Sequence, residues 1–179
     1  MAHGHDMDQL HHGGLPEKAE RQIVETTLDT LRRTTRQAIH GWLSPARSES
    51  FATPDLVAAS GIRYLCDWAN DDMPYVMHTA SGPIHCMPHS PDIDDHTILL
   101  QNHHSEGEFR EQIVDQFDRL HEEAGRFGGR IMAISLHPWI IGQPYRIGAL
   151  ETALDQIMGR GGVWCTTGAQ ILDAWAAQQ

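Results

Sequence analysis

Cysteine is scarce in this sequence, which has only three among its 179 residues: Cys66, Cys86 and Cys165. The number is odd, the three lie far apart, and none stands in a CxxC spacing. Disulfide frameworks use paired cysteines and thiolate zinc sites use closely spaced ones, so the sequence predicts neither. We interpret the three as small apolar residues of the core.

Long apolar runs are also missing. No stretch approaches the roughly 20 residues that span a bilayer, and no charged segment followed by an apolar one opens the chain in the manner of a secretory signal. Glycine-rich phosphate loops and the GxSxG nucleophile elbow are absent as well. The sequence therefore predicts a cytoplasmic location and no membrane partner, and it gives little support to nucleophilic serine chemistry.

Positive charge is outnumbered, because 13 Lys and Arg stand against 24 Asp and Glu, for a formal net charge of -11. Such a chain repels a phosphate backbone unless a local basic patch outweighs the overall field. The one short cluster of arginines, Arg32, Arg33 and Arg36, fits the solvated face of a helix. We therefore expect no nucleic-acid partner.

What the sequence does contain is enough apolar residues for one core, 40% of the chain, arranged in alternating helical and strand-like patterns. The patterns predict helices at 16–37, 53–61, 108–126, 145–158 and 168–177. They predict strands at 39–43, 62–66, 131–136 and 162–165, and a small strand near 84–87 inside a long polar excursion, 71–95. The alternation indicates an α/β fold with parallel strands, as a single domain over 1–179.

Polar side chains follow several of these strands, where the carboxyl ends of parallel strands usually carry the functional groups. Arg47 and Ser48 follow the first strand, Asp67 and Trp68 the second, and His137 and Trp139 the run 131–136, which reads as a strand buried on both faces. His103 and His104 follow Ile98–Leu100, interpreted as another strand end. Structural roles are the alternatives: a surface charge for Arg47, a loop cap for Asp67 and a polar loop for the two histidines.

Among these residues, His137 is the strongest candidate, because burial and a nearby carboxylate would tune an imidazole for proton transfer near neutral pH. It closes an apolar run and is followed by a proline.

Three segments, GWLSPARSES, YLCDWANDDMPY and ISLHPWIIGQPYRI, resemble successive blocks of the polysaccharide deacetylase superfamily, and ILLQNHHSEGEF lies between the second and the third. The resemblance is greatest to the allantoinase-like and cyclic-imide-hydrolase-like branch. It implies a distorted (β/α) barrel, in the manner of a TIM-like barrel, that hydrolyses a carbon–nitrogen bond. The implied substrate is a small cyclic amide, such as allantoin or a cyclic imide, or an N-acetylated sugar.

The resemblance also implies roles for single residues. His137, in the Leu-His block, would be the general acid, and Asp67 with Trp68 would fix and tune it. Arg47 would orient catalytic carboxylates or bind substrate. We expect substrate contacts from Trp68, Trp139, His103, His104 and Ser48.

A metal site is suggested less clearly, because AHGHDMDQ resembles a family His-x-x-x-His element with His3 first and Met7 in the second position. A thioether is a poor replacement for an imidazole as a zinc ligand, although His5 and Asp6 lie close in sequence. The expectation is therefore no cofactor, or a divalent metal such as zinc with His3 among its ligands.

Some features of the family are not found. The paired-aspartate block that precedes the histidine element has no counterpart, and only Met1 and Ala2 precede His3, so no strand is expected to hold it. About five strands are predicted, fewer than the roughly seven or eight that close such a barrel. We therefore interpret the chain as the carboxyl-terminal portion of a longer hydrolase.

Two other functions stay open. An uncovered sheet edge would favour a homo-oligomer, so the chain could be a catalytically incomplete subunit that acts in oligomer assembly or ligand binding. A third interpretation is a histidine-rich metal-binding protein, since four of the thirteen histidines fall in the first twelve residues.

Overall fold

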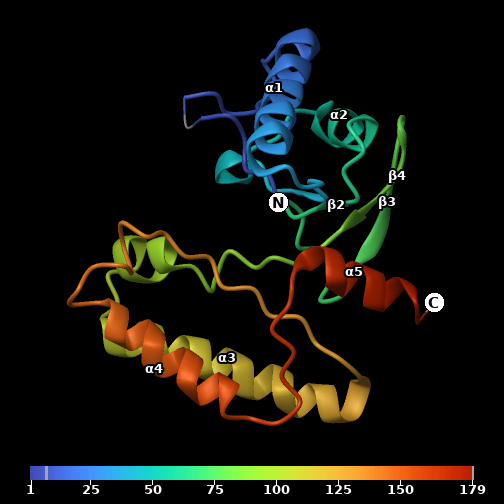
Figure 1. The fold of residues 1–179 in the computed structure, drawn as a ribbon. Helices are drawn as coiled ribbons and strands as arrows, with labels where there is room; N and C mark the ends of the chain where they lie inside the picture. The colour runs from blue at the N-terminus through green and yellow to red at the C-terminus, as the bar shows by residue number, and fades with distance from the viewer. Residues whose placement is uncertain (7, 179) are drawn as a thin grey trace. The chain divides into compact units, whose positions relative to one another are not determined.

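The computed structural model describes residues 1–6 and 8–178, which form two compact units (Figure 1). Unit 1 consists of residues 1–88 together with the residues from Thr166 onward, and unit 2 is His89–Cys165. The single domain predicted over 1–179 stays a prediction, and each unit is described by itself below.

A mixed sheet lies at the centre of unit 1. Its strands are β1 (Gly41–Trp42), β2 (Tyr64–Leu65), β3 (Tyr75–Thr79) and β4 (Gly82–Cys86), in the order β1-β2-β4-β3. β1, β2 and β4 run parallel, while β3 runs antiparallel to β4. The predicted parallel α/β arrangement is thus confirmed for the first two strands and β4.

The first residues of the chain join this sheet. Ala2 pairs in parallel with Trp42: its N–H donates to the carbonyl of Gly41 over 2.8 Å, and its own carbonyl accepts from the N–H of Leu43 over 3.0 Å. No strand is assigned before His3, as expected, yet this isolated bridge to the edge of β1 holds the backbone there.

Helices α1 (Glu17–Thr35), α2 (Thr53–Ala59) and α5 (Gly168–Ala176) complete unit 1 and agree with the predicted helices. The apolar face of α1 brings Val24 and Leu28 against the sheet, because residues four apart lie on one side of a helix. The core that they share contains Ala2, Trp42, Val57, Ile62, Leu65 and Ile84.

Tyr64 in β2 has glycines on either side of its ring. A Cβ at Gly41 would lie 2.1 Å from the ring, and a Cβ at Gly168 would lie 2.7 Å from the hydroxyl oxygen. Only glycine fits at either position, so the ring packs directly against the backbone of β1 and the first turn of α5. That helix begins with a capping box between Thr167 and Gln170.

The polar excursion predicted over 71–95 contains a β-hairpin. Its second strand, β4, overlaps the small strand predicted near 84–87. β3 was not predicted, because it lies in a segment rich in Pro, Gly, His and Asp that was interpreted as irregular. β4 lies between β2 and β3, so this part of the segment belongs to the sheet.

Two long helices, α3 (Glu106–Phe127) and α4 (Ile147–Met158), pack against each other in unit 2. Both were predicted, and α3 begins with a capping box between Ser105 and Glu108. Their shared core includes Phe109 and Ile113 of α3 and contains, in addition, Ile98, Ile140, Ile141, Leu150, Ala153 and Ile157.

Three strands predicted in this unit are not observed. Residues 131–136 are half-buried or exposed, and their one ladder contact is a parallel bridge between Ser135 and Asp94. Residues 162–165 form no strand, and Ile98–Leu100 lie in a π-helix, η2 (His96–Gln101). A strand needs a neighbour along its whole length, and among the described residues only the Asp94 segment pairs with one of these runs.

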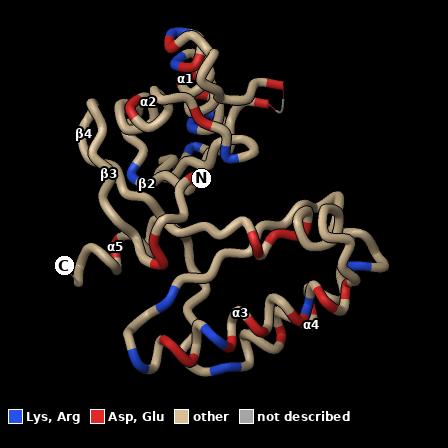
Figure 2. The backbone as a smooth tube through the Cα atoms, turned by 180° about the vertical axis from the view of Figure 1, so that it is seen from behind, with Lys and Arg blue, Asp and Glu red and all other residues tan. Residues whose placement is uncertain are grey.

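Charged residues of both signs lie along α3 (Figure 2), where Arg119 pairs with Glu122 and Glu123 and Arg126 pairs with Glu122. Arginines neutralised in this way do not form a basic patch. Within the described part of the chain, no helix is both long enough and apolar enough to cross a membrane.

Candidate functional site

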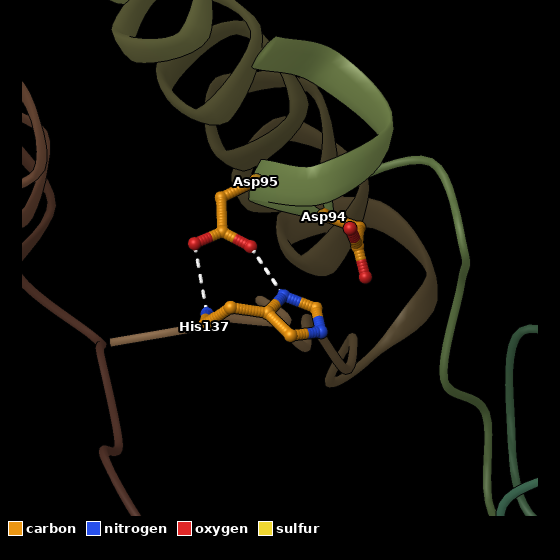
Figure 3. A group of neighbouring side chains, drawn as sticks. All are labelled: Asp94, Asp95 and His137. Carbon is orange, nitrogen blue, oxygen red and sulfur yellow. Dashed lines mark hydrogen bonds and ion pairs between the residues drawn. The ribbon is translucent and has the colours of Figure 1, made fainter. Parts of the chain in front are cut away.

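His137 lies directly against Asp95 in unit 2 (Figure 3). Its Nδ1 is 2.6 Å from Oδ1 of Asp95, and its backbone N–H donates to Oδ2 of the same carboxylate over 2.8 Å. The Asp95 side chain is completely buried, whereas that of His137 is 40% exposed. One carboxylate thus holds both the backbone and the ring of a histidine that solvent can reach.

Backbone pairing brings these two residues together. The N–H of Ser135 donates to the carbonyl of Ile93, and the N–H of Asp95 donates to the carbonyl of Ser135. His137 follows two residues later, while Asp95 stands at the start of η2, whose first turns are fixed by a bond from Thr97 N–H to Asp94. The pairing explains why one strand-like residue suffices to place the histidine.

The hydrogen bonds set the tautomer of His137. An ionised, buried carboxylate beside Nδ1 favours the proton on that nitrogen, so Nε2 is the nitrogen left for exchange with a ligand or water. The rings of His96 and Trp139 lie next to the His137 ring, with centroids 5.9 Å and 6.0 Å from the centroid of that ring. The sequence-predicted Trp139 therefore stands beside the predicted acid histidine, with 61% of its own surface exposed.

Asp94, Asp95 and His137 could also hold a metal ion, since each offers a ligand atom within 4.8 Å of the others. Carboxylate oxygen and imidazole nitrogen suit zinc. However, both oxygens of Asp95 already accept bonds from His137, and Nδ1 is used in one of them. A metal would have to bind Nε2 and Asp94 with few other ligands, so the donor set fits proton transfer better than a closed zinc site.

At the predicted metal position in unit 1, Nδ1 of the exposed His3 is 2.8 Å from the carbonyl oxygen of Leu43. Asp6 accepts bonds from Asp8 N–H and Gln9. Among the described residues, no group of three possible ligands forms there, and Met7 lies outside them. His3 alone provides one imidazole nitrogen, which is too few ligands for a zinc site.

Unit 1 has its own cavity, of about 490 Å³, which brings Arg47, Asp67 and Trp68 together. Gly13, Glu49, Ser50, Phe51 and Pro54 complete the lining. Three of the sequence-predicted residues thus meet in one place, as the rule about strand ends indicates.

Residues 44–47 form the turn that presents Arg47. Asp67 accepts a bond from the N–H of Ser44 over 2.7 Å, and the Ser44 hydroxyl in turn accepts from the indole N–H of Trp42. Ala46 and Arg47 both have a φ of 53°, in the left-handed region that L side chains rarely adopt. Consecutive strained residues of this kind are found more often at functional sites than elsewhere.

Glu49 is a residue of this cavity that the sequence did not single out. Its Oε2 accepts from the indole N–H of Trp68 over 2.8 Å. Burial, followed by the hydrogen bond and charge of Asp67 and the charge of Glu20, raises the pKa of Glu49 from 4.5 to about 8, against the lowering effect of Trp68. Glu49 therefore carries a proton at neutral pH.

Other predicted binding residues have structural contacts. The hydroxyl of Ser48 donates to the carbonyl of Pro45 and closes the turn. His104 Nδ1 is 2.8 Å from the side-chain nitrogen of Gln112, and His103 is exposed with a φ of 56°. Both histidines follow η2 and not a strand, so the reason for selecting them was wrong, and their substrate contacts stay a prediction.

The candidates therefore form two groups. His137 and Trp139 lie in unit 2, while Arg47, Asp67 and Trp68 lie in unit 1. The tuning of His137 by Asp67 stays a prediction, and the carboxylate that the structure places on His137 is Asp95. Sequence reasoning missed Asp95 because it lies within the polar excursion; the pair Asp94–Asp95 directly after a buried Ile93 was the available signal.

No family model matches the chain. It is 30% identical over 122 residues to a protein of Schizosaccharomyces pombe (strain 972 / ATCC 24843) that is provisionally named a polysaccharide deacetylase. The match covers 63% of this chain and 38% of the yeast protein.

Solved structures share the fold over nearly the whole chain. The Puue allantoinase superposes with a TM-score of 0.87 at 26% identity, over 99% of this chain and 58% of its own. A provisionally named polysaccharide deacetylase of Pseudomonas aeruginosa PAO1 gives 0.86 at 27% identity, over 99% and 59%. One of Mycobacterium smegmatis, at 22% identity and a TM-score of 0.83 over 98% and 62%, shows the fold alone.

This chain spans less than two thirds of the length of each of these relatives. The α/β arrangement of parallel strands and helices is common to them, whereas a closed barrel stays a prediction for this chain. Sequence and fold together show that the chain is homologous to the polysaccharide deacetylases.

Proposed function

We propose that this chain contributes to the hydrolysis of a carbon–nitrogen bond, in a small cyclic amide such as allantoin or a cyclic imide, or in an N-acetylated sugar. The observation that carries the proposal is the pairing of His137 with the buried Asp95, which leaves Nε2 accessible. Homology to polysaccharide deacetylases and an allantoinase supports the reaction type.

In the proposed reaction, water adds to the carbonyl carbon and the bond from that carbon to nitrogen breaks. His137 in its imidazolium form gives the Nε2 proton to the departing nitrogen, and it keeps the Nδ1 proton that Asp95 holds. Asp95 stays ionised throughout, as the partner of a general-acid histidine does in other hydrolases. The proton that the attacking water loses returns through solvent to Nε2 of His137, so the imidazolium is restored. One water is consumed: an N-acetylated sugar gives a free amine and acetic acid, whereas a cyclic amide opens to one product that carries both the carboxylic acid and the freed N–H group.

Arg47, Asp67 and Trp68 are proposed to bind a small polar ligand in the unit 1 cavity. A volume of about 490 Å³ is within the range of small-molecule pockets, which favours a compact ligand over a polymeric glycan. If zinc is bound, Asp94 and His137 would hold it, and it would supply a Lewis acid that polarises a carbonyl. The homo-oligomer and the cytoplasmic location stay predictions.

Turnover of allantoin, a cyclic imide and a chitin oligosaccharide, assayed on the full-length protein, tests this function. We expect His137→Ala to lower turnover of the accepted substrate by about 100-fold or more while the far-UV circular dichroism is unchanged. His78→Ala, at an exposed histidine of β3, is the matched control and should keep full turnover.

Undiminished turnover of His137→Ala would reject the assignment. Absence of turnover with all three compounds in the wild-type protein would favour the other interpretation, a subunit that acts in assembly or ligand binding.

A further inference from the structure

Two carboxyl groups face each other in the unit 1 cavity. Oε1 of Glu49 and Oδ2 of Asp67 are both buried, and neither meets a protein donor among the described residues if both groups are ionised. Buried acceptors without a donor cost free energy, so they normally find a partner. A single proton placed between the two oxygens provides that partner for both, since one carboxyl then donates to the other.

We propose that Glu49 and Asp67 share one proton in this cavity, and that Glu49 is the positioning residue that uses it to hold Asp67 toward the ligand. Glu49 keeps the proton because Asp67 accepts the backbone N–H of Ser44, a contact that stabilises the ionised form of a carboxyl. The remaining oxygen of Glu49 is bound by the indole of Trp68. The like charge of Asp67 disfavours the ionised form of Glu49.

The charged and titratable groups near Glu49 agree with this assignment. Asp67 and Glu20 are acidic, Cys86 is a buried thiol, and Arg47 is the cation in the lining of the cavity. With one shared proton the carboxyl pair carries a single negative charge, which Arg47 balances. The cavity is then suited to a neutral polar molecule, and loss of the proton at alkaline pH would give it an excess negative charge.

The shared proton can be observed through Trp68, because its indole bonds to Glu49. We expect the tryptophan fluorescence of the full-length chain, titrated between about pH 6 and about pH 10, to change with a midpoint near pH 8. Glu49→Gln should abolish the transition, since glutamine mimics the protonated acid without titrating. Asp67→Asn should move it to lower pH, because the hydrogen bond and charge that raise the pKa of Glu49 are then gone.

Two tryptophan variants locate the signal. Trp68→Phe should lose the transition, whereas Trp139→Phe, at an exposed tryptophan of unit 2, should keep it. A wild-type protein without a transition in this range, or a transition that survives Glu49→Gln, would overturn the proposal.

Unfolding by urea gives a second measurement. The folded state holds the Glu49 proton more tightly than the unfolded state, so wild-type stability should fall as pH rises from 4.5 to about 8, a loss that Glu49→Gln should not show. Equal pH dependence in both proteins would contradict the shared proton.

The effect on turnover rests on the proposed function, but the spectroscopic and unfolding tests do not. Because loss of the shared proton adds a negative charge to the cavity, wild-type turnover should decline above about pH 8. If Glu49→Gln abolishes the fluorescence transition and also removes this alkaline decline of turnover, the positioning role is supported. If the transition is lost and the pH profile of turnover is unchanged, the positioning role is rejected. If His137→Ala has no effect on turnover, the hydrolase assignment fails independently of the proton pair.

Discussion

The ring and the backbone of His137 are held by one side chain, that of Asp95, which lies 42 residues earlier in the sequence. Two bonds to a single buried carboxylate fix the ring plane and the tautomer together. A histidine restrained in this way needs no reorganisation before it exchanges a proton, which is a general requirement of acid–base catalysis.

Replacing Asp95 by asparagine tests this restraint. The variant keeps the size of the side chain but loses the charge, so the Nδ1–H tautomer should no longer dominate. We expect turnover of the accepted substrate to fall by about 10–100-fold, as it does when a group that orients a functional histidine is changed. Nitrogen NMR of the imidazole should show a mixture of tautomers, and an unchanged spectrum would contradict the role given to Asp95.

Asp94 distinguishes proton transfer from metal binding. If His137 acts without a metal, Asp94→Asn should lower turnover by less than about threefold and leave the zinc content of the purified protein unchanged, because Asp94 contributes no bond to the ring. A loss of bound zinc together with turnover would instead identify the three residues as a metal site. Asp92→Asn, at an exposed aspartate nearby, is the control.

A buried hydrogen-bonded pair in unit 1 should set its stability. Glu20 and His11 are both completely buried, 2.8 Å apart, and Glu20 also accepts the hydroxyls of Ser50 and Thr53. Glu20→Gln leaves this group of donors without a charged acceptor, so we expect a loss of about 2–4 kcal/mol in the free energy of unfolding. Urea denaturation at neutral pH measures it, with exposed Glu25→Gln as the control.

The same pair should make stability sensitive to acid. Burial alone raises the pKa of Glu20, but the hydrogen bonds from His11, Ser50 and Thr53 outweigh it and lower the pKa below 4.5. A carboxyl whose pKa is lower in the folded state stabilises that state at pH values above its pKa in the unfolded state. The contribution is lost as the pH falls through its pKa in the folded state. The difference between wild type and Glu20→Gln should therefore shrink in acid; a difference that grows would refute the lowered pKa of Glu20.

Contact between β1 and β2 depends on the missing side chain at Gly41. A methyl group there would lie 2.1 Å from the Tyr64 ring. We expect Gly41→Ala to cost about 1–3 kcal/mol, the usual effect of overpacking. Gly13→Ala, where nothing lies within 4 Å of the added carbon, should be nearly neutral. Equal thermal melting of the two variants would show that the sheet relaxes to accept the methyl group.

Periodic apolar residues made the helices predictable from sequence. α1 and α3 carry their buried residues on one face, and capping residues mark the start of α3 and α5. Continuous apolar runs were less informative. Residues 131–136 and 98–100 were predicted as strands, but the first run has a single bridge, from Ser135 to Asp94, and the second lies in η2. A strand forms through a neighbour that can lie anywhere in the chain, whereas a helix bonds within itself.

For the candidate sites, strand ends and block resemblance located His137, Arg47, Asp67 and Trp68, three of which meet in one cavity. The two partner carboxyls, Asp95 and Glu49, were missed. Each acts through a contact with a residue far from it in sequence or through burial, and neither property leaves a local pattern. The adjacent Asp94 could have drawn attention to Asp95, and the block GWLSPARSES, which contains Glu49, to that glutamate.

Unit 1 is assembled from two stretches of chain that enclose the whole of unit 2 in the sequence. The later stretch supplies α5, which meets Tyr64 through Gly168, forms an ion pair with Arg63 through Asp173, and places Trp175 on His85. During synthesis, unit 2 has therefore left the ribosome before unit 1 can be completed. A chain stopped at Cys165 should therefore contain a protease-resistant unit 2 and a protease-sensitive unit 1. Although synthesis of unit 1 begins first, its folding is completed after that of unit 2.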